Sequence, residues 1–156
     1  MKAAFALIVP VLLIAGTARG EDPVSDGASI YGRCAACHTA SGAGLPGAFP
    51  ALNRDFRTMA NSAAGRRYLA LVVNLGLVGP LEVEGQSYRN VMPAQSDLAP
   101  PDIAAVLNHV GTRISHDGPP FRAFTPGEVA GYLGDAGKIS PSDLAALHAT
   151  LAKGGA

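Results

Sequence analysis

The sequence contains no tryptophan, few other aromatic residues (6%) and only two cysteines in 156 residues. The chain therefore has little aromatic material of its own for a core. Two cysteines without a second pair cannot supply the four ligands that a structural zinc site usually needs. Charged residues make up 15% of the chain and the formal net charge is zero. So balanced a composition gives no basis for binding nucleic acid or an anionic membrane surface.

Both cysteines lie in one pentapeptide, Cys-Ala-Ala-Cys-His at residues 34–38. A C-x-x-C-H run is the attachment signature of a c-type haem. In a helix Cys34 and Cys37 are three residues apart on one face, within reach of two neighbouring vinyl groups of the porphyrin. His38 follows and can present a ring nitrogen to the iron if its other nitrogen is held by an acceptor.

A C-x-x-C pair has other uses, namely a thioredoxin-like redox pair, half of a zinc site or a short-range disulfide. His109, His116 and His148 lie far along the chain without ligand-like spacing. Thioredoxin-like motifs lie beside a strand in a βαβ unit, and no strongly β-branched run surrounds Cys34. We therefore predict one haem c, bound covalently through Cys34 and Cys37, as the principal aromatic body of the core.

The N-terminus has the form of a secretory signal peptide, with Lys2, an apolar stretch at 3–15 and small residues at 16–20. We predict cleavage after Ala18 or Gly20. The apolar stretch is shorter than the ~18 residues needed to span a bilayer, so no membrane span is expected in the mature form. The remaining residues, 21–156, fit a single periplasmic domain, and export agrees with haem attachment outside the cytoplasm.

Periodicity predicts a chain of short helices and long loops. A short helix at 28–33 runs into the cysteine motif, and residues 39–50 form a glycine- and proline-rich loop. Apolar residues recur at helical spacing between 61 and 75, and residues 79–88 suggest a small hairpin. A further helix at 103–110 places Ile103, Val106, Leu107 and Val110 on one face.

Two capping signatures predict two more helices near the C-terminus. Thr125-Pro126-Gly127-Glu128 is a capping box with proline at the first helical position, and residues 140–143 repeat the device. These helices would either cover the core or form a docking surface for a larger complex. His116 and His148 are interpreted as solvent or loop histidines.

The residues alone leave the sixth coordination position of the iron to methionine, histidine, water or an open site. Met92 is followed by Pro93, which discourages helix at Met92 and helps to present its thioether from a loop. Met59 is interpreted more simply as a core or surface residue.

Taken together, the cysteine motif, the loop ending in Phe49-Pro50-Ala51-Leu52, Met92-Pro93 and the helix from Asp102 resemble class I cytochrome c over about residues 26–110. The likeness is greatest to small monohaem cytochromes and to cytochrome subunits that accompany bacterial dehydrogenases. The resemblance implies an all-α fold, with short helices and long loops wrapped around one haem. Residues 111–156 would form a C-terminal extension of two extra helices.

The resemblance also implies roles for the matched positions. The Pro50 carbonyl would accept a hydrogen bond from His38, Leu52 would pack on the haem, and Met92 would be the sulfur ligand. Gly27 and Ala28 would allow a close crossing with the helix that ends near His109. At His109 the family commonly has an aromatic residue, and we interpret this histidine as a packing residue.

These features predict an electron carrier and not an enzyme. A haem iron with two protein ligands changes oxidation state with little structural change. The expected partners are redox proteins, met transiently or as subunits of a dehydrogenase or oxidase complex, with a dehydrogenase-type donor and a respiratory acceptor. The alternative is a haem enzyme or small-ligand sensor with an open or labile sixth position.

Overall fold

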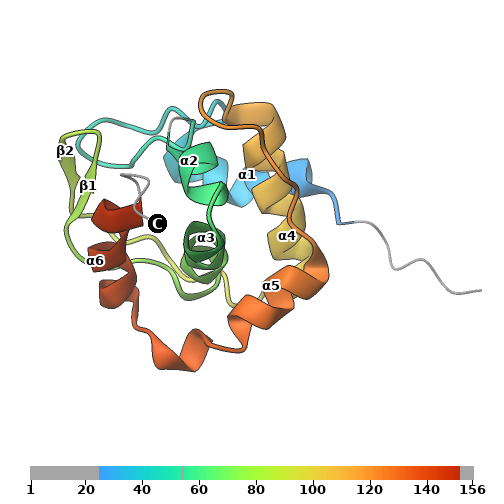
Figure 1. Ribbon diagram of the computed structural model, residues 1–156. Coiled ribbons are helices and arrows are strands. Elements are labelled where there is room, and N and C mark those ends of the chain that lie inside the picture. The colour runs from blue at the N-terminus through green and yellow to red at the C-terminus, as the bar shows by residue number, and fades with distance from the viewer. Residues whose placement is uncertain (1–24, 54, 152–156) are drawn as a thin grey trace, which may run out of the picture.

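A computed structural model describes residues 25–53 and 55–151 of the protein. The predicted signal peptide at 1–20 lies outside the described residues. Within the described part the α-helices are α1 (Gly27–His38), α2 (Phe56–Ala60), α3 (Ala63–Leu75), α4 (Pro100–His109), α5 (Pro126–Leu133) and α6 (Pro141–Leu151), and a π-helical turn, η1 (Val110–Ile114), and a 3-10 turn, η2 (Ala136–Lys138), lie between them. The fold is mostly helical, as predicted (Figure 1). None of these helices has the length and apolar character required to cross a membrane.

The predicted hairpin is present as strands β1 (Leu81–Val83) and β2 (Gln86–Tyr88), which pair antiparallel. Gly85, with φ of 77°, takes the left-handed turn position that glycine adopts without strain. The helical pattern at 61–75 corresponds to α3, and its cap is Ser62, whose side chain accepts from the Gly65 amide. The five-residue α2 ahead of it was not predicted, because so short a helix leaves almost no periodic signal.

The crossing of α1 and α4 forms the base of the domain. A Cβ atom at Gly27 would lie 2.2 Å from the carbonyl oxygen of Ala105, so the two backbones are closer than any other residue would allow. The predicted apolar face of α4 is buried. The rings of Tyr31 and His109 pack with centroids 5.2 Å apart. His109 is therefore a packing residue at the helix crossing, as interpreted from the sequence.

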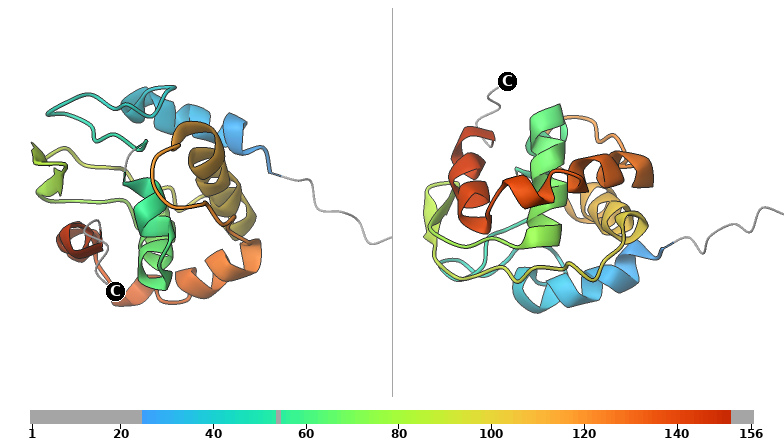
Figure 2. Two further views of the ribbon diagram at one scale, coloured as in Figure 1. Left: turned by 45° about the horizontal axis from the view of Figure 1, so that its top comes forward. Right: turned by 90° about the horizontal axis from the view of Figure 1, so that it is seen from below.

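The two C-terminal helices lie against the domain. Helix α5 packs on α3 and α4, and α6 packs on α3 and β1. Both helices bury an apolar side chain completely, Val129 in α5 and Leu144 in α6. In both views of Figure 2, α6 lies across the molecule from α1. The extension thus covers the core, which was one of the two roles considered for it.

The capping predictions for these helices are correct at one site and half wrong at the other. Ser140 and Asp143 form the reciprocal pair, in which each side chain accepts from the other's backbone amide. Thr125 accepts from the Glu128 amide at 3.1 Å. The carboxylate of Glu128 does not return to the cap, because it is bound by the guanidinium of Arg66.

Candidate cofactor site

The cysteine motif forms the last part of α1. Asp26 caps the start of the helix by accepting from the Ala28 amide, and Thr39, with φ of 65°, ends it directly after the motif. Cys34 and Cys37 are free thiols, both partly buried. The helix therefore holds the two sulfur atoms three residues apart on a rigid element, with the histidine at its end.

His38 is held in one orientation by the loop that follows it. Its Nδ1 atom lies 2.9 Å from the carbonyl oxygen of Pro50. Burial lowers the pKa of His38, while the contact with Pro50 acts in the opposite direction. A neutral imidazole that donates from Nδ1 keeps the lone pair of Nε2 for a metal ion. The predicted contact with Pro50 is present, and its role in orienting an iron ligand remains a prediction.

The loop at 39–50 is shaped by backbone hydrogen bonds close to the histidine. The Gly44 amide donates to the His38 carbonyl at 2.9 Å, and the Leu52 amide donates to the Gly42 carbonyl at 2.7 Å. Gly44 has φ of 66°, and a Cβ atom there would lie 2.4 Å from the Phe49 carbonyl oxygen. This tight loop brings Pro50 and Leu52 back over the end of α1.

One cavity brings the predicted site residues together. Its wall includes the six residues predicted from the sequence, Cys34, Cys37, His38, Pro50, Leu52 and Met92. The rest of the wall is mainly aliphatic and comes from α3 and the segment around the hairpin, as Leu69, Val72, Leu77, Leu81 and Val83. A flat apolar macrocycle is the kind of group that such a wall can surround.

Met92 is fixed in the cavity wall by its backbone. Its amide donates to the Leu77 carbonyl and its carbonyl accepts from the Leu77 amide, both at 3.0 Å. Gly76 ends α3 with φ of 75°, and a Cβ atom there would lie 2.4 Å from the Met92 carbonyl oxygen. Met59 of α2 also lines the cavity, and it is buried. Two methionine side chains therefore reach the wall.

Among the polar side chains that the structure places in the wall and the sequence did not indicate, three meet at one point: Asp55, Tyr68 and His148. The interpretation of His148 as a solvent or loop residue is wrong, since it lies in α6 and is 4% exposed. Its Nε2 atom lies 3.2 Å from Oδ2 of Asp55. A usable signal was its spacing of four from Leu144, which puts both on one helix face.

The other uses of a C-x-x-C pair do not fit this geometry. Burial raises the pKa of the Cys34 thiol, whereas a redox-active cysteine needs a lowered pKa. Helix α1 precedes a loop, and the strands of the described residues lie far along the chain. Across 25–53 and 55–151 there is no group of three His, Cys, Asp or Glu side chains arranged to hold a metal ion.

Comparison with known proteins agrees with the site. The sequence profile of the cytochrome c family matches residues 24–113. The chain belongs to the cytochrome c family. It is 43% identical over 105 residues to a cytochrome c-552 of Thermus thermophilus, covering 67% of this chain and 69% of that protein. A second cytochrome c-552 of Thermus thermophilus is 47% identical over 88 residues, covering 56% of this chain and 67% of the relative.

Membership of this family establishes haem c as the cofactor and electron transfer as the activity of the chain. The site fits the group, because two free thiols, a neutral imidazole and an apolar wall meet in one cavity. When bound, the haem supplies an iron that gains and loses one electron. The protein would hold the macrocycle through Cys34 and Cys37, against the aliphatic side chains of the wall.

Proposed function

We propose that the protein is a periplasmic electron carrier in which His38 and Met92 are the two axial ligands of the haem iron. The observation that carries this proposal is the position of Met92 in the same cavity wall as His38. The amide and the carbonyl of Met92 are both hydrogen-bonded to Leu77. A methionine thioether opposite a histidine raises the reduction potential and leaves no position open for a substrate. This ligand set suits outer-sphere electron transfer better than catalysis at the iron.

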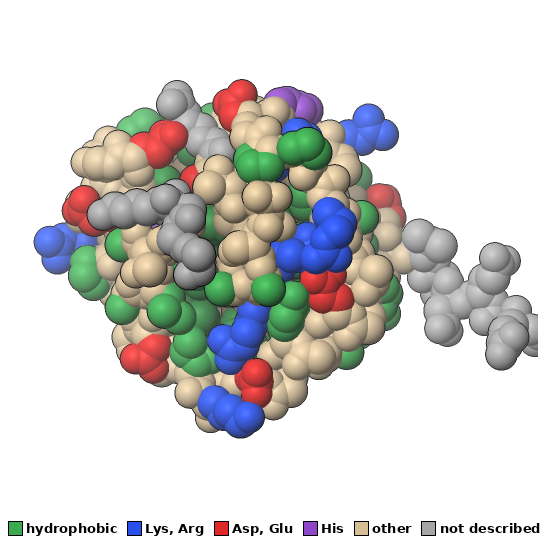
Figure 3. Space-filling view, in the orientation of Figure 1, with side chains coloured by type: hydrophobic (Ala, Val, Ile, Leu, Met, Phe, Trp, Pro, Cys, Tyr) green, Lys and Arg blue, Asp and Glu red, His purple; other side chains and the backbone are tan. Residues whose placement is uncertain are grey.

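The surface supports a transient contact with a redox partner. Positive and negative side chains are interspersed on the face seen in Figure 3, with apolar side chains between them. Val91, next to Met92 and part of the cavity wall, is 57% exposed. Apolar contact near the cavity mouth would bring a partner close to the haem, as in small redox encounters. We propose that the protein relays electrons through the surface around Val91, from a dehydrogenase-type donor to a respiratory acceptor.

The ligand assignment is tested with a matched pair of variants, Met92→Leu and Met59→Leu. Leucine nearly preserves the volume of methionine but has no sulfur. The oxidised wild type is expected to show a weak sulfur-to-iron charge-transfer band at the red edge of the visible spectrum. The band should disappear in Met92→Leu and persist in Met59→Leu.

Two results would contradict the proposal. Loss of the band in Met59→Leu alone would assign the sulfur ligand to α2. A wild type that is high-spin when reduced and binds carbon monoxide readily would identify an open iron position, and with it a haem enzyme or ligand sensor.

A further inference from the structure

His148 is a buried histidine with one unused nitrogen in the wall of the haem cavity. Nε2 is bound to Asp55, but Nδ1 is buried and has no hydrogen-bond partner among residues 25–53 and 55–151. Buried polar atoms in native proteins are nearly always paired, so an unpaired one calls for a ligand or another explanation. Since the same side chain lines the cavity, the haem is the ligand at hand.

Few titratable groups contact this imidazole. Asp55, just ahead of α2, faces Nε2, and Tyr68 of α3 packs its ring against the imidazole with centroids 5.8 Å apart. Burial, and then the nearby Asp55 carboxylate, raise the pKa of Tyr68 well above its ordinary value. Tyr68 therefore stays neutral, and the charge that faces His148 is the carboxylate of Asp55. A protonated imidazole beside a carboxylate is a favourable pair inside a protein.

The position of α6 indicates which edge of the haem is expected beside His148 and Asp55. The cysteines are on α1, and α6 lies across the molecule from α1 in both views of Figure 2. A macrocycle joined to the chain through its vinyl carbons carries its two propionate groups on the opposite edge. His148 and the two cysteines thus line one cavity from helices on opposite sides of the fold, so the haem edge opposite the cysteines is the one expected beside His148.

We propose that His148, held by Asp55, binds a proton that is coupled to the oxidation state of the haem, so that the reduction potential depends on pH through this residue. Reduction of iron(III) by one electron from the redox partner lowers the charge of the haem by one. The lower charge favours uptake of one proton from solvent by the imidazole. By linkage, loss of that proton stabilises iron(III), and the potential falls as the pH rises. Such coupling gives the C-terminal extension a part in electron transfer.

The experiment measures the midpoint potential of the haem-loaded protein between about pH 5 and 8, the range in which histidine titrates. In the wild type the potential should fall across this range. His148→Gln, whose amide can still bind Asp55, should show at most a tenth of that change. His116→Gln, a substitution of an exposed histidine, is the matched control and should retain it in full. In Asp55→Asn the fall should move to lower pH, because the charge favouring the imidazolium is removed.

Equal pH dependence in the wild type and His148→Gln, or its loss in His116→Gln, would overturn the proposal. If His148→Gln fails to retain haem, NMR titration of the His148 ring in the wild type decides instead. The midpoint of that titration should lie at higher pH in the reduced protein, and equal midpoints in the two oxidation states would contradict the coupling. The inference rests on the proposed electron carrier, but the two fail separately. The sulfur-to-iron band reports on Met92, and the pH dependence reports on His148.

Discussion

Two buried polar junctions tie the C-terminal extension to the rest of the protein, and they differ in how completely their hydrogen bonds are satisfied. At the α5 junction Arg66, 1% exposed, makes five hydrogen bonds, two to Glu128 and three to backbone carbonyl groups. Its guanidinium also lies 3.8 Å from the centre of the Phe124 ring. At the α6 junction His148 uses one nitrogen and leaves the other unpaired within the described chain.

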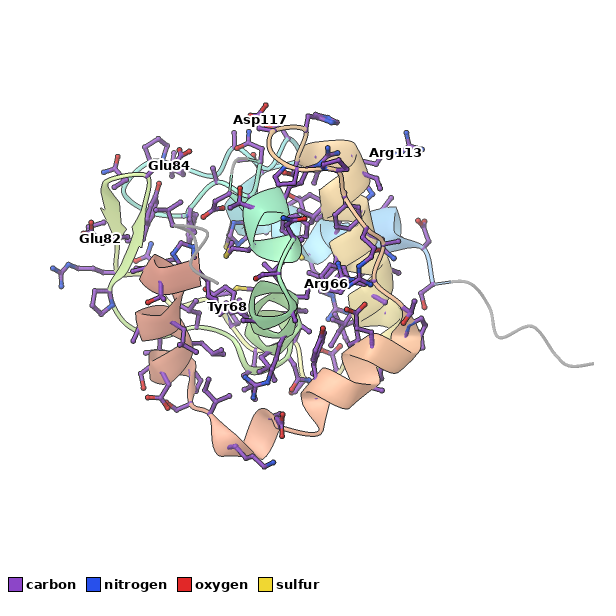
Figure 4. All side chains as sticks on the ribbon, viewed as in Figure 1. Arg66, Tyr68, Glu82, Glu84, Arg113 and Asp117 are labelled. Atoms are coloured by element: carbon purple, nitrogen blue, oxygen red, sulfur yellow. The ribbon has the colours of Figure 1, made fainter. Side chains whose placement is uncertain are left out.

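The position of each junction explains the difference. Arg66 and Tyr68 leave α3 on opposite sides, Arg66 toward α5 and Tyr68 toward α6 (Figure 4). Tyr68 and His148 line the haem cavity, and Arg66 does not. A fully satisfied network stabilises the fold and has nothing left to offer a ligand. The junction with an unused nitrogen is the one beside the cofactor. Complete hydrogen bonding therefore marks the junction that stabilises the fold, and the unpaired nitrogen marks the one that can contact the haem.

The largest effect is expected from Arg66→Met. The variant leaves the Glu128 carboxylate without its main partner and removes five hydrogen bonds, so the free energy of unfolding should fall by about 4 kcal/mol. The midpoint potential and its pH dependence should stay as in the wild type. The adjacent Arg67→Met is the matched control, since Arg67 makes a looser pair with Asp135 at 3.5 Å. Denaturant unfolding of both variants gives the comparison.

A loss of stability as large in Arg67→Met as in Arg66→Met would remove the distinction between a buried network and a surface pair. A shift of the potential in Arg66→Met would show that the α5 junction also acts on the haem.

The second-largest effect is expected from acid, which should weaken the α5 junction. The hydrogen bonds from Arg66 lower the pKa of Glu128 from its ordinary 4.5 to about 2. The unfolded chain therefore binds a proton at higher pH than the folded protein does. The stability from this carboxylate is complete above about pH 5 and is lost as the pH falls through about 2. With allowance for solvent screening the loss is about 2 kcal/mol.

The measurement is the free energy of unfolding against pH for the wild type and Glu128→Gln. The glutamine variant starts lower and lacks this part of the acid loss, so the difference between the two curves should shrink toward about pH 2. A constant difference across the range would contradict the lowered pKa.

The smallest effects are expected at the helix caps. Thr125→Ala and Ser140→Ala each remove a side-chain oxygen that accepts from a first-turn amide, and each should cost about 1 kcal/mol of unfolding free energy. Thr150→Ala, on the exposed face of α6, is the control and should cost nothing measurable. If the midpoint potential no longer depended on pH in Ser140→Ala but still did so in Thr125→Ala, the result would support the proposed coupling between α6 and the haem.

Local signals in the sequence were sufficient for much of this molecule. The C-x-x-C-H spacing, the glycine and proline loop and the caps at Thr125 and Ser140 depend on neighbours a few residues away. The apolar face of α4 was predicted from the helical period of its apolar residues, because a helix that is buried on one side has apolar residues at that spacing. These parts include the covalent half of the haem site.

Contacts between segments that are distant in the chain could not be predicted from the sequence. The spacing of four from Leu144 could have placed His148 on the buried face of α6, but its pairing with Asp55, which lies far earlier in the chain, could not be read from that spacing. Glu128 looked like a capping residue because its partner Arg66 lies on another helix. Both errors concern a polar side chain whose pairing is decided by tertiary packing, which a single sequence does not display.

The paired hydrogen bonds between Leu77 and Met92 bear on the speed of electron transfer. They bind the backbone of Met92 on both sides directly after α3 ends at Gly76. With Met92 as the proposed ligand, these bonds would hold its sulfur near one position in both oxidation states of the iron. A small nuclear reorganisation energy would follow, which would allow an electron to cross during a brief encounter.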